Sequence, residues 1–423
     1  MINRNSCTVL IFVCLASTAQ AEDSSACFGA LPAQARLPEC NKLIDRNPKD
    51  AAALLERAKI NIDLEHYTDA LADANRVIEI NPKSQVAVRL SHLAQAKSEP
   101  RATLQDLDRQ IEKSPQSAEL YFMRSGEYLK IREIQKAIED NDRALKLGPG
   151  TSKYYHQRAD ILYRWFGKKS DALAALTTAI ERDPQNTSNY ELRIVYRDRE
   201  KDTTGADSDF EKILEIESRK SNNESGIAFW RRWRAYELSK YLRYNEAVTE
   251  LNRVIAANPK DLEALDLRGY VQAQDKKLQV AILDWNQVLA IDPKYWKSYG
   301  NRCAVQVVLG DFTLAVRDCG EGIKLNPKYP NLFKHRGVAR LKLGQETEGI
   351  ADIDEAIKLS GSNYAAAFVV RAEVYERQNH LAEAISHFEL ALKSTERPGN
   401  LDDITARETA RAAIARLKGA PPK

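Results

Sequence analysis

Hydrophobic and polar residues alternate along this chain with the period of short amphipathic helices. One stretch divides into two such segments, 51–64 and 67–80, and the second is closed by Asn81-Pro82. In both, the apolar residues return at intervals of three and four, which places them on one face of a helix. Proline cannot continue the preceding helix and Asn favours a turn, so the pair marks a boundary. Helices joined this tightly are expected to pack antiparallel.

Prolines repeat this unit along most of the chain at intervals of 33 to 35 residues. The series is Pro48, Pro82, Pro115, Pro149, Pro184, then Pro259, Pro293 and Pro327. The gap of 75 residues between Pro184 and Pro259 equals two steps of 34 and seven more, and we place that insertion in the polar segment 219–226. A fixed period of this length is the signature of a tandem helical repeat.

Each repeat has a small residue midway along its first helix and another early in its second. They are Ala58, Ser125, Ala159, Ala235, Gly269, Gly337 and Ala372, and then Ala70, Ala137, Ala172, Ala247, Ala281, Ala315 and Ala384. Small side chains let the two helix axes approach closely. With the 34-residue period, the large residue that opens each first helix and the closing proline, residues 26–393 resemble the tetratricopeptide repeat.

The resemblance implies an all-α, right-handed superhelical solenoid of about ten antiparallel helix hairpins. In that family the first helices line a concave groove, which usually binds peptide segments of other proteins, and the repeats are scaffolds without chemistry. Two repeats depart from the pattern: Pro100 stands where an inter-helix turn is required, and a charged segment, 198–202, falls within another repeat. We expect the superhelix to bend or loosen at both.

The resulting organisation has seven parts. They are a signal peptide at 1–21, a partial repeat at 22–48, repeats at 49–218, a polar loop at 219–226, repeats at 227–398, a capping helix at 399–418 and a tail at 419–423. Asn400 is a suitable N-cap for the capping helix. Leu401, Ile404, Ile414 and Leu417 predict its apolar stripe.

Nine repeats carry an arginine just before the small residue of the first helix, which the family pattern does not require. An acid usually follows sixteen residues later, as in Arg57 and Asp73, Arg124 and Asp140, Arg268 and Asp284, Arg302 and Asp318, and Arg336 and Asp352. We favour structural Arg–carboxylate pairs within or between repeats, since a partly buried charge needs a partner. The alternative is a ladder of arginines that bind a ligand.

The N-terminus predicts export. Arg4, an apolar run at 9–16 and Ala19-Gln20-Ala21 have the pattern of a cleaved secretory signal, with an uncleaved anchor helix as the alternative. We favour the bacterial periplasm, with secretion as the other possibility. No stretch reaches the ~18 apolar residues that a membrane span needs, so none is expected in the mature chain. With 63 Lys and Arg against 60 Asp and Glu, we expect no nucleic-acid partner.

Four cysteines remain after the signal is removed. Four allow three pairings, and their order along the chain favours Cys27 with Cys40 and Cys303 with Cys319. An oxidising compartment would form both disulfides. The alternative is four buried free thiols.

The most unusual composition lies at 229–236, where aromatic and arginine residues open one repeat. On the family's groove face we expect Phe229, Arg232, Trp233, Tyr236 and Lys240, joined by Tyr270, His156, Tyr163 and Arg164. Such anchors suit an extended segment with apolar and acidic residues. The alternative is that the aromatic side chains fill the seam between repeats.

Nothing in the sequence predicts an enzyme, a metal site or a cofactor. The six His are scattered, and phosphate-binding and hydrolase motifs are absent from the sequence. The family's clamp for a C-terminal carboxylate is not expected, because Val338 stands where that clamp requires Asn. We therefore predict a non-enzymatic scaffold that binds a peptide segment of a protein partner in its groove. The alternative is a structural subunit of an envelope assembly, in contact through its convex face and loops.

Overall fold

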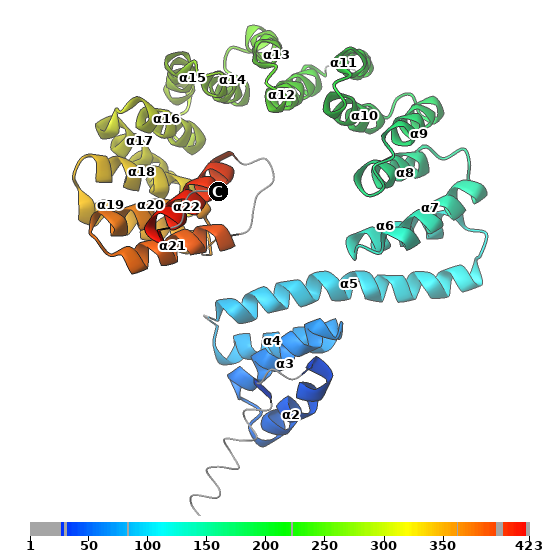
Figure 1. Ribbon diagram of the computed structural model, residues 1–423. Coiled ribbons are helices and arrows are strands. Elements are labelled where there is room, and N and C mark those ends of the chain that lie inside the picture. Colours follow the sequence, from blue (N-terminus) through cyan, green and yellow to red (C-terminus); the bar gives the residue numbers. More distant parts are fainter. Residues whose placement is uncertain are drawn as a thin grey trace, which may run out of the picture. The chain divides into compact units, whose positions relative to one another are not determined.

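The computed structural model describes residues 27–28, 32–82, 84–220, 223–361, 363–394 and 401–419. These residues form helices and turns without a strand, and the helices follow one another in packed pairs (Figure 1). The chain divides into two compact units, Met1–Tyr196 and Arg197–Lys423. The predicted signal peptide and Asn400 lie outside the described residues.

Unit 1 begins with a partial repeat and continues through successive helix pairs. Its helices are α2 (Ala33–Arg46), α3 (Ala51–Asp63), α4 (Tyr67–Ile80), α5 (Gln85–Lys113), α6 (Ala118–Lys130), α7 (Ile134–Leu147), α8 (Ser152–Arg164), α9 (Lys169–Arg182) and most of α10 (Thr187–Arg199).

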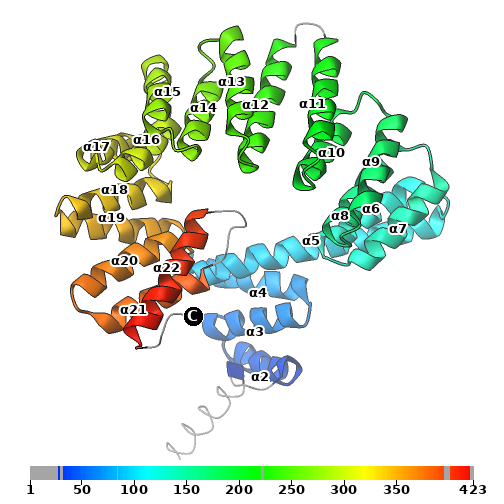
Figure 2. The same ribbon diagram turned by 45° about the horizontal axis from the view of Figure 1, so that its top comes forward.

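Unit 2 continues the series. Its helices are α11 (Thr203–Ser218), α12 (Glu224–Lys240), α13 (Tyr244–Ala257), α14 (Leu262–Gln274), α15 (Leu278–Ile291), α16 (Trp296–Leu309), α17 (Phe312–Leu325), α18 (Pro330–Lys342), α19 (Glu346–Leu359), α20 (Ala365–Arg377), α21 (Leu381–Lys393) and α22 (Leu401–Leu417). The first helices contact one another from α12 through α14 and α16 to α18. We call the side of unit 2 that they form the first-helix face (Figure 2).

The small residues lie where the paired helices cross. A methyl group at Gly269 would stand 2.7 Å from the Trp285 ring, and one at Gly337 would stand 2.9 Å from the carbonyl oxygen of Gly349. Neither neighbour is the free end of a flexible side chain, so a larger residue would push the two helices apart. These positions therefore set the spacing within each pair.

The turns between the two helices of each pair share one backbone feature, a residue with positive φ. It is Glu65, Arg132, Gly167, Lys201, Leu242, Lys276, Gly310, Gly344 or Asn379. Lys201 shows that the charged segment 198–202 is simply such a turn, since α10 ends at Arg199 and α11 begins at Thr203. The charged segment therefore joins the two helices of one hairpin, as the corresponding turns do in other repeats.

The departure expected at Pro100 takes the form of a continuous helix, because α5 runs as a single helix of 29 residues through that proline. Its first part packs on α4 and its later part on α6. Good helix formers flank the proline, as in Ala94-Gln95-Ala96-Lys97 and Arg101-Ala102, and these favour continuation of the helix. The repeat is thus present as one long helix instead of a hairpin.

The seven-residue insertion before Pro259 is mostly helical, whereas a polar loop at 219–226 was expected. It adds two residues to α11, which has 16 where seven other second helices have 14, and four to α12, which has 17 where most first helices have 13. The seventh inserted residue lengthens the connection between hairpins. Five residues separate α11 from α12, whereas four separate most other hairpins. On the lengthened α12, Arg234 pairs with Asp198 and Asp207 of the preceding hairpin.

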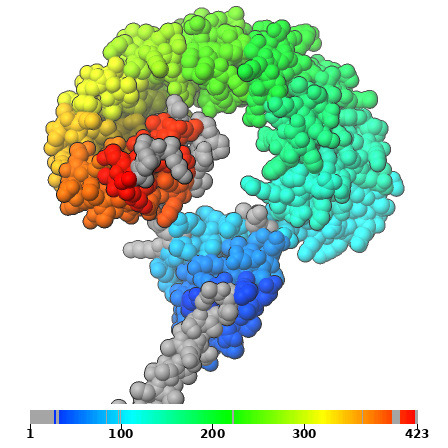
Figure 3. Space-filling view, viewed as in Figure 1, coloured from blue at the N-terminus to red at the C-terminus, as the bar shows by residue number. Residues whose placement is uncertain are grey.

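Two disulfides cross-link helices of the series, and a terminal helix packs on its last hairpin. Cys27 bonds to Cys40 in the partial repeat, and Cys303 on α16 bonds to Cys319 on α17. Helix α22 packs against α20 and α21, beside the orange hairpin of Figure 3. Its buried residues are Ala406, Ala410 and Ala413, with Ile414 and Leu417 partly buried beside them and Ile404 exposed. The expected stripe was therefore only partly right, since alanines allow α22 its close contact.

Candidate functional site

The arginines of the repeats bind carboxylates in a regular pattern. In five repeats Nε and one terminal nitrogen both donate to one aspartate sixteen residues later, at 2.6 to 2.9 Å; the pairs are Arg57–Asp73, Arg124–Asp140, Arg268–Asp284, Arg302–Asp318 and Arg336–Asp352. In four of them the remaining terminal nitrogen donates to a side chain sixteen residues earlier, namely Asn41, Asp108, Asn252 or Asn286.

Each arginine therefore joins the two helices of its own hairpin and, where that third bond is made, the preceding hairpin. We call these five pairs the arginine ladder. Their aspartates are at most 10% exposed, so the carboxylates are not available to a ligand. The geometry is that of a structural tie between repeats.

The aromatic residues singled out in α12 lie on the first-helix face, but their charged neighbours are already paired. Phe229 and Tyr236 are 53% and 46% exposed. Arg232 binds Asp261 at 2.7 Å and Glu263 at 3.1 Å. Trp233 is half-buried and packs edge-on against Trp230 of the same helix. The Lys240 Nζ lies 4.4 Å from the ring centre of Tyr236, and the Tyr270 hydroxyl accepts a hydrogen bond from Gln274. Exposed aromatic surface remains here, without a free arginine.

The other three residues expected in that groove belong to unit 1. His156 shares a hydrogen bond of 2.9 Å with Asn189, Tyr163 stacks on Tyr196 at 3.8 Å between ring centres, and Arg164 pairs with Asp160 at 2.6 Å. All three have partners within unit 1. The structure therefore places the nine residues in two separate units.

A pocket of about 350 Å³ lies between three successive first helices, α14, α16 and α18. We call it the α14–α18 pocket; it is lined by Asp266, Trp296, Lys297, Gly300, Asn301, Ala304, Tyr329, Asn331, Leu332 and His335. Leu332 is buried and forms its floor, while the rings of Trp296 and Tyr329 meet at 4.8 Å between centres. An apolar floor with a few convergent polar groups is typical of a binding site.

The polar groups of this pocket are held in place by their neighbours. Asp266 Oδ1 accepts hydrogen bonds from Ser298 at 2.6 Å and from Asn301 at 3.3 Å. The Tyr364 hydroxyl donates to Asn331 at 2.7 Å. Burial raises the pKa of the Asp266 carboxyl, while these hydrogen bonds and Lys297 act in the opposite direction. Burial and the nearby Lys334 charge lower the pKa of His335 well below 6.5, so that ring is neutral at pH 7.

Sequence reasoning missed this pocket. Its members come from three repeats and are individually ordinary, and no run of aromatic residues announces them. The available signal was their register, because Asp266, Asn301 and His335 occupy groove-facing places in successive first helices. Gly300 was a second signal, since a methyl group there would come within 3.2 Å of Leu332 and narrow the pocket.

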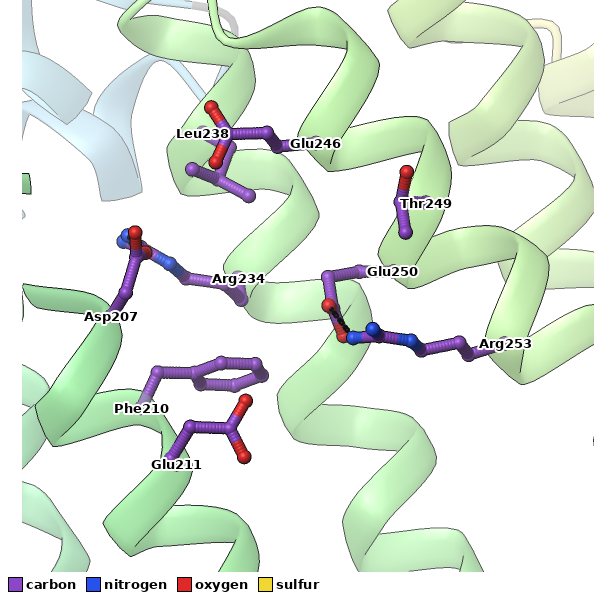
Figure 4. Close-up of a pocket in the computed structure, with 9 residues that line it drawn as sticks. All are labelled: Asp207, Phe210, Glu211, Arg234, Leu238, Glu246, Thr249, Glu250 and Arg253. Carbon is purple, nitrogen blue, oxygen red and sulfur yellow. Dashed lines mark hydrogen bonds and ion pairs between the residues drawn. The ribbon is translucent and has the colours of Figure 1, made fainter. Parts of the chain in front are cut away.

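A second pocket, of about 220 Å³, lies between α11, α12 and α13 (Figure 4). Arg234 lies beside it, 1% exposed, and pairs with Asp198 and Asp207. Glu250 is bound by Arg253, as the figure shows, and also by Arg231. The pairs of Arg234 with Asp207 and of Arg231 with Glu250 thus join neighbouring helices beside this pocket.

The part of the chain that the structure describes contains neither a candidate metal site nor a candidate membrane span. No three His, Cys, Asp or Glu side chains there are grouped closely enough to hold a metal ion. None of the described helices combines the length and the hydrophobicity that crossing a membrane requires.

Comparison with known proteins identifies the repeats. A family model described as the tetratricopeptide repeat matches residues 235–295 and 335–400. The human mitochondrial import receptor subunit TOM70 is 23% identical over 193 residues, which are 43% of this chain and 32% of the receptor. The chain therefore spans about a third of that relative's length.

Two solved structures have related architecture. A tetratricopeptide-repeat protein of Thermus thermophilus is 21% identical, with a TM-score of 0.39 over 44% of this chain and 98% of that one. Yeast Tom70 is 16% identical, with a TM-score of 0.48 over 91% of this chain and 86% of that one. The family match shows that residues 235–295 and 335–400 are tetratricopeptide repeats.

Proposed function

We propose that this chain binds an extended segment of a partner protein along the first-helix face of unit 2. The observation that carries the proposal is the α14–α18 pocket, which three successive first helices build together. Exposed aromatic side chains on α12 and α14, among them Phe229 and Tyr270, extend the apolar surface along the same face. Aromatic anchors beside a preformed pocket are the usual basis of protein recognition.

The test is affinity capture with the full chain and two matched variants. Ala304→Arg puts a long charged side chain into the pocket, and Leu283→Arg makes a comparable change on α15, where Leu283 is 65% exposed. We expect captured partners to be lost with Ala304→Arg and kept with Leu283→Arg. Equal melting temperatures establish that both variants are folded. Capture that survives Ala304→Arg would contradict the proposal.

A specific observation also supports the second candidate, a structural subunit in contact through second helices. Val280 and Leu283 on α15 and Leu314 on α17 are 44%, 65% and 42% exposed. Apolar side chains gathered on second helices favour a contact on that side. The same experiment separates the two candidates, since this one predicts loss with Leu283→Arg and retention with Ala304→Arg.

We further propose that the chain is exported, with the periplasm as the favoured compartment. Two disulfides support this, because they persist in oxidising compartments and are rare in the cytosol. N-terminal sequencing of the chain isolated from its source should then begin at Glu22. A chain that retains residues 1–21 in the cytosolic fraction would contradict export.

A further inference from the structure

Asp266 is a partly buried carboxylate that lines the α14–α18 pocket. No Lys, Arg or His nitrogen of the described residues lies within ion-pair distance of it, and its bonds come from the neutral Ser298 and Asn301. Oδ1 receives both shorter bonds, and Oδ2 has only a 3.5 Å contact with the Asn301 amide. One oxygen therefore retains most of its capacity to accept.

Other shielded acids of unit 2 show the contrast. Asp198, Asp284, Asp318 and Asp352 are each paired with at least one arginine. A carboxylate removed from water is costly unless a cation or several donors compensate it. Asp266 differs from these four in that it faces an open pocket, from which a cation could reach it.

The remaining lining suits a flat cation. Trp296 and Tyr329 form the aromatic rim, and aromatic faces attract guanidinium and ammonium groups. Neutral His335 adds no opposing charge at pH 7. Burial above all, and then the nearby Asp266, Glu263 and Asp261, raise the pKa of Tyr295 to about 12, so three carboxylates lie near this end of α16.

We propose that the α14–α18 pocket binds an arginine side chain of the partner segment, with its guanidinium on Asp266 and against the Trp296 and Tyr329 rings. Arginine is favoured over lysine because its planar group can stack on a ring while it donates to a carboxylate. The inference rests on the proposed function and adds the chemistry of the partner. It also reverses the acidic ligand expected from the arginines of α12.

The charged and titratable groups around Asp266 are compatible with this ligand. On α12, Arg232 is occupied by Asp261 and Glu263. On α16, the exposed Lys297 is near enough to influence the Asp266 pKa but forms no ion pair with it, and Tyr295, just before α16, is neutral at pH 7. On α18, His335 is neutral at pH 7, and the adjacent Lys334 carries a positive charge that acts on His335. Lys297 is thus the competing cation, and replacing it should strengthen arginine binding.

The experiment uses two neutral-backbone probes, N-acetyl-arginine N-methylamide and the isosteric citrulline compound, which lacks the charge. The indole N–H signal of Trp296 is followed by NMR in the full chain and assigned with Trp296→Phe. We expect saturable shifts with the arginine probe, none with the citrulline probe, and a loss of about ten- to hundredfold in affinity with Asp266→Asn. Lys297→Met should bind about two- to fivefold more tightly.

Several results would overturn the inference. Equal binding of citrulline would remove the role of charge, and unchanged binding by Asp266→Asn would remove the role of the carboxylate. If Lys297→Met lowered the melting temperature and left affinity unchanged, Lys297 would be the natural partner of Asp266. A partner captured through the pocket without an arginine contact refutes this inference alone, whereas arginine binding without any captured partner refutes the proposed function.

Discussion

Two seams of unit 2 solve the same packing problem in different ways. Between α14 and α19 every hairpin follows the arginine ladder, as in Arg302, which holds Asp318 ahead of it and Asn286 behind it. Between α11 and α12, Arg234 turns back to Asp198 and Asp207, and Arg231 binds Glu250 in its place. The seven-residue insertion lengthens both helices there, so the arginine in register no longer meets its own hairpin's acid.

The difference concerns burial as well as partners. Arg234 and Asp198 are each 1% exposed, whereas the ladder arginines retain 12% to 20% exposure. A fully buried pair depends on its partner far more than one that water can reach. The regular seam leaves a pocket open to ligands on the first-helix face, and the irregular seam uses its charges to hold the helices together.

The largest effect is expected where the pair is buried. Asp198→Ala leaves the Arg234 guanidinium in the seam with only the half-exposed Asp207, and we expect a loss of about 3–5 kcal/mol in the free energy of unfolding. Urea denaturation followed by tryptophan fluorescence measures it. A loss no greater than that of the ladder variant below would show that the two seams are equivalent.

The Cys303–Cys319 disulfide should contribute somewhat less. Replacing both cysteines by Ala removes a cross-link between residues 16 apart, which is worth about 3 kcal/mol if the unfolded chain is the main state affected. Urea denaturation under oxidising conditions gives the change, and the wild type with reductant serves as control. Stability that is unaffected by either treatment would contradict this contribution.

A ladder pair should be worth less again. Asp284→Ala leaves Arg268 partly in water and still bonded to Asn252, so we expect a loss of about 1–2 kcal/mol. The same denaturation experiment applies, with Asp284→Asn as the variant that keeps the side-chain shape. A loss of 4 kcal/mol or more would mean that a ladder pair contributes as much to stability as the buried Arg234–Asp198 pair.

The smallest effect should have the opposite sign. The pKa of Asp266 is raised in the folded chain, so its ionisation opposes folding above that pKa and this cost disappears as pH falls towards the ordinary value of 3.8. Asp266→Asn can still accept a hydrogen bond from Ser298. It should therefore melt at a slightly higher temperature than the wild type at pH 7, and at the same temperature as the wild type near pH 4. Calorimetry at both pH values tests this, and a lower melting temperature at pH 7 would contradict it.

Much of the fold could be predicted from the sequence because each repeat carries its own boundary and packing signals. The proline steps mark the boundaries, and the sixteen-residue spacing of Arg57 and Asp73 anticipates a contact between facing helices. The sequence marked Pro100 as a departure from the repeat pattern but did not predict its form, a continuous helix, which the good helix formers on both sides of the proline favour. Arg234 also departs from its register, because an insertion changes which acid it can reach.

The candidate site was less accessible to sequence reasoning. The composition of 229–236 drew attention to α12, but the structure pairs its Arg232 with acids and half-buries its Trp233 against Trp230. Asp266 is important because no cation of the described residues lies within ion-pair distance of it. That absence depends on how three helices pack together. A single sequence records which charges exist but not which of them remain unpaired.

The most direct test of the account is site-specific photo-cross-linking in the cells that make this protein. A benzophenone amino acid is placed at position 304, in the α14–α18 pocket, or at position 283 on α15. We predict a discrete adduct from position 304 that mass spectrometry maps to an arginine-containing segment of one partner, with none from position 283. Adducts from position 283 alone would contradict the account.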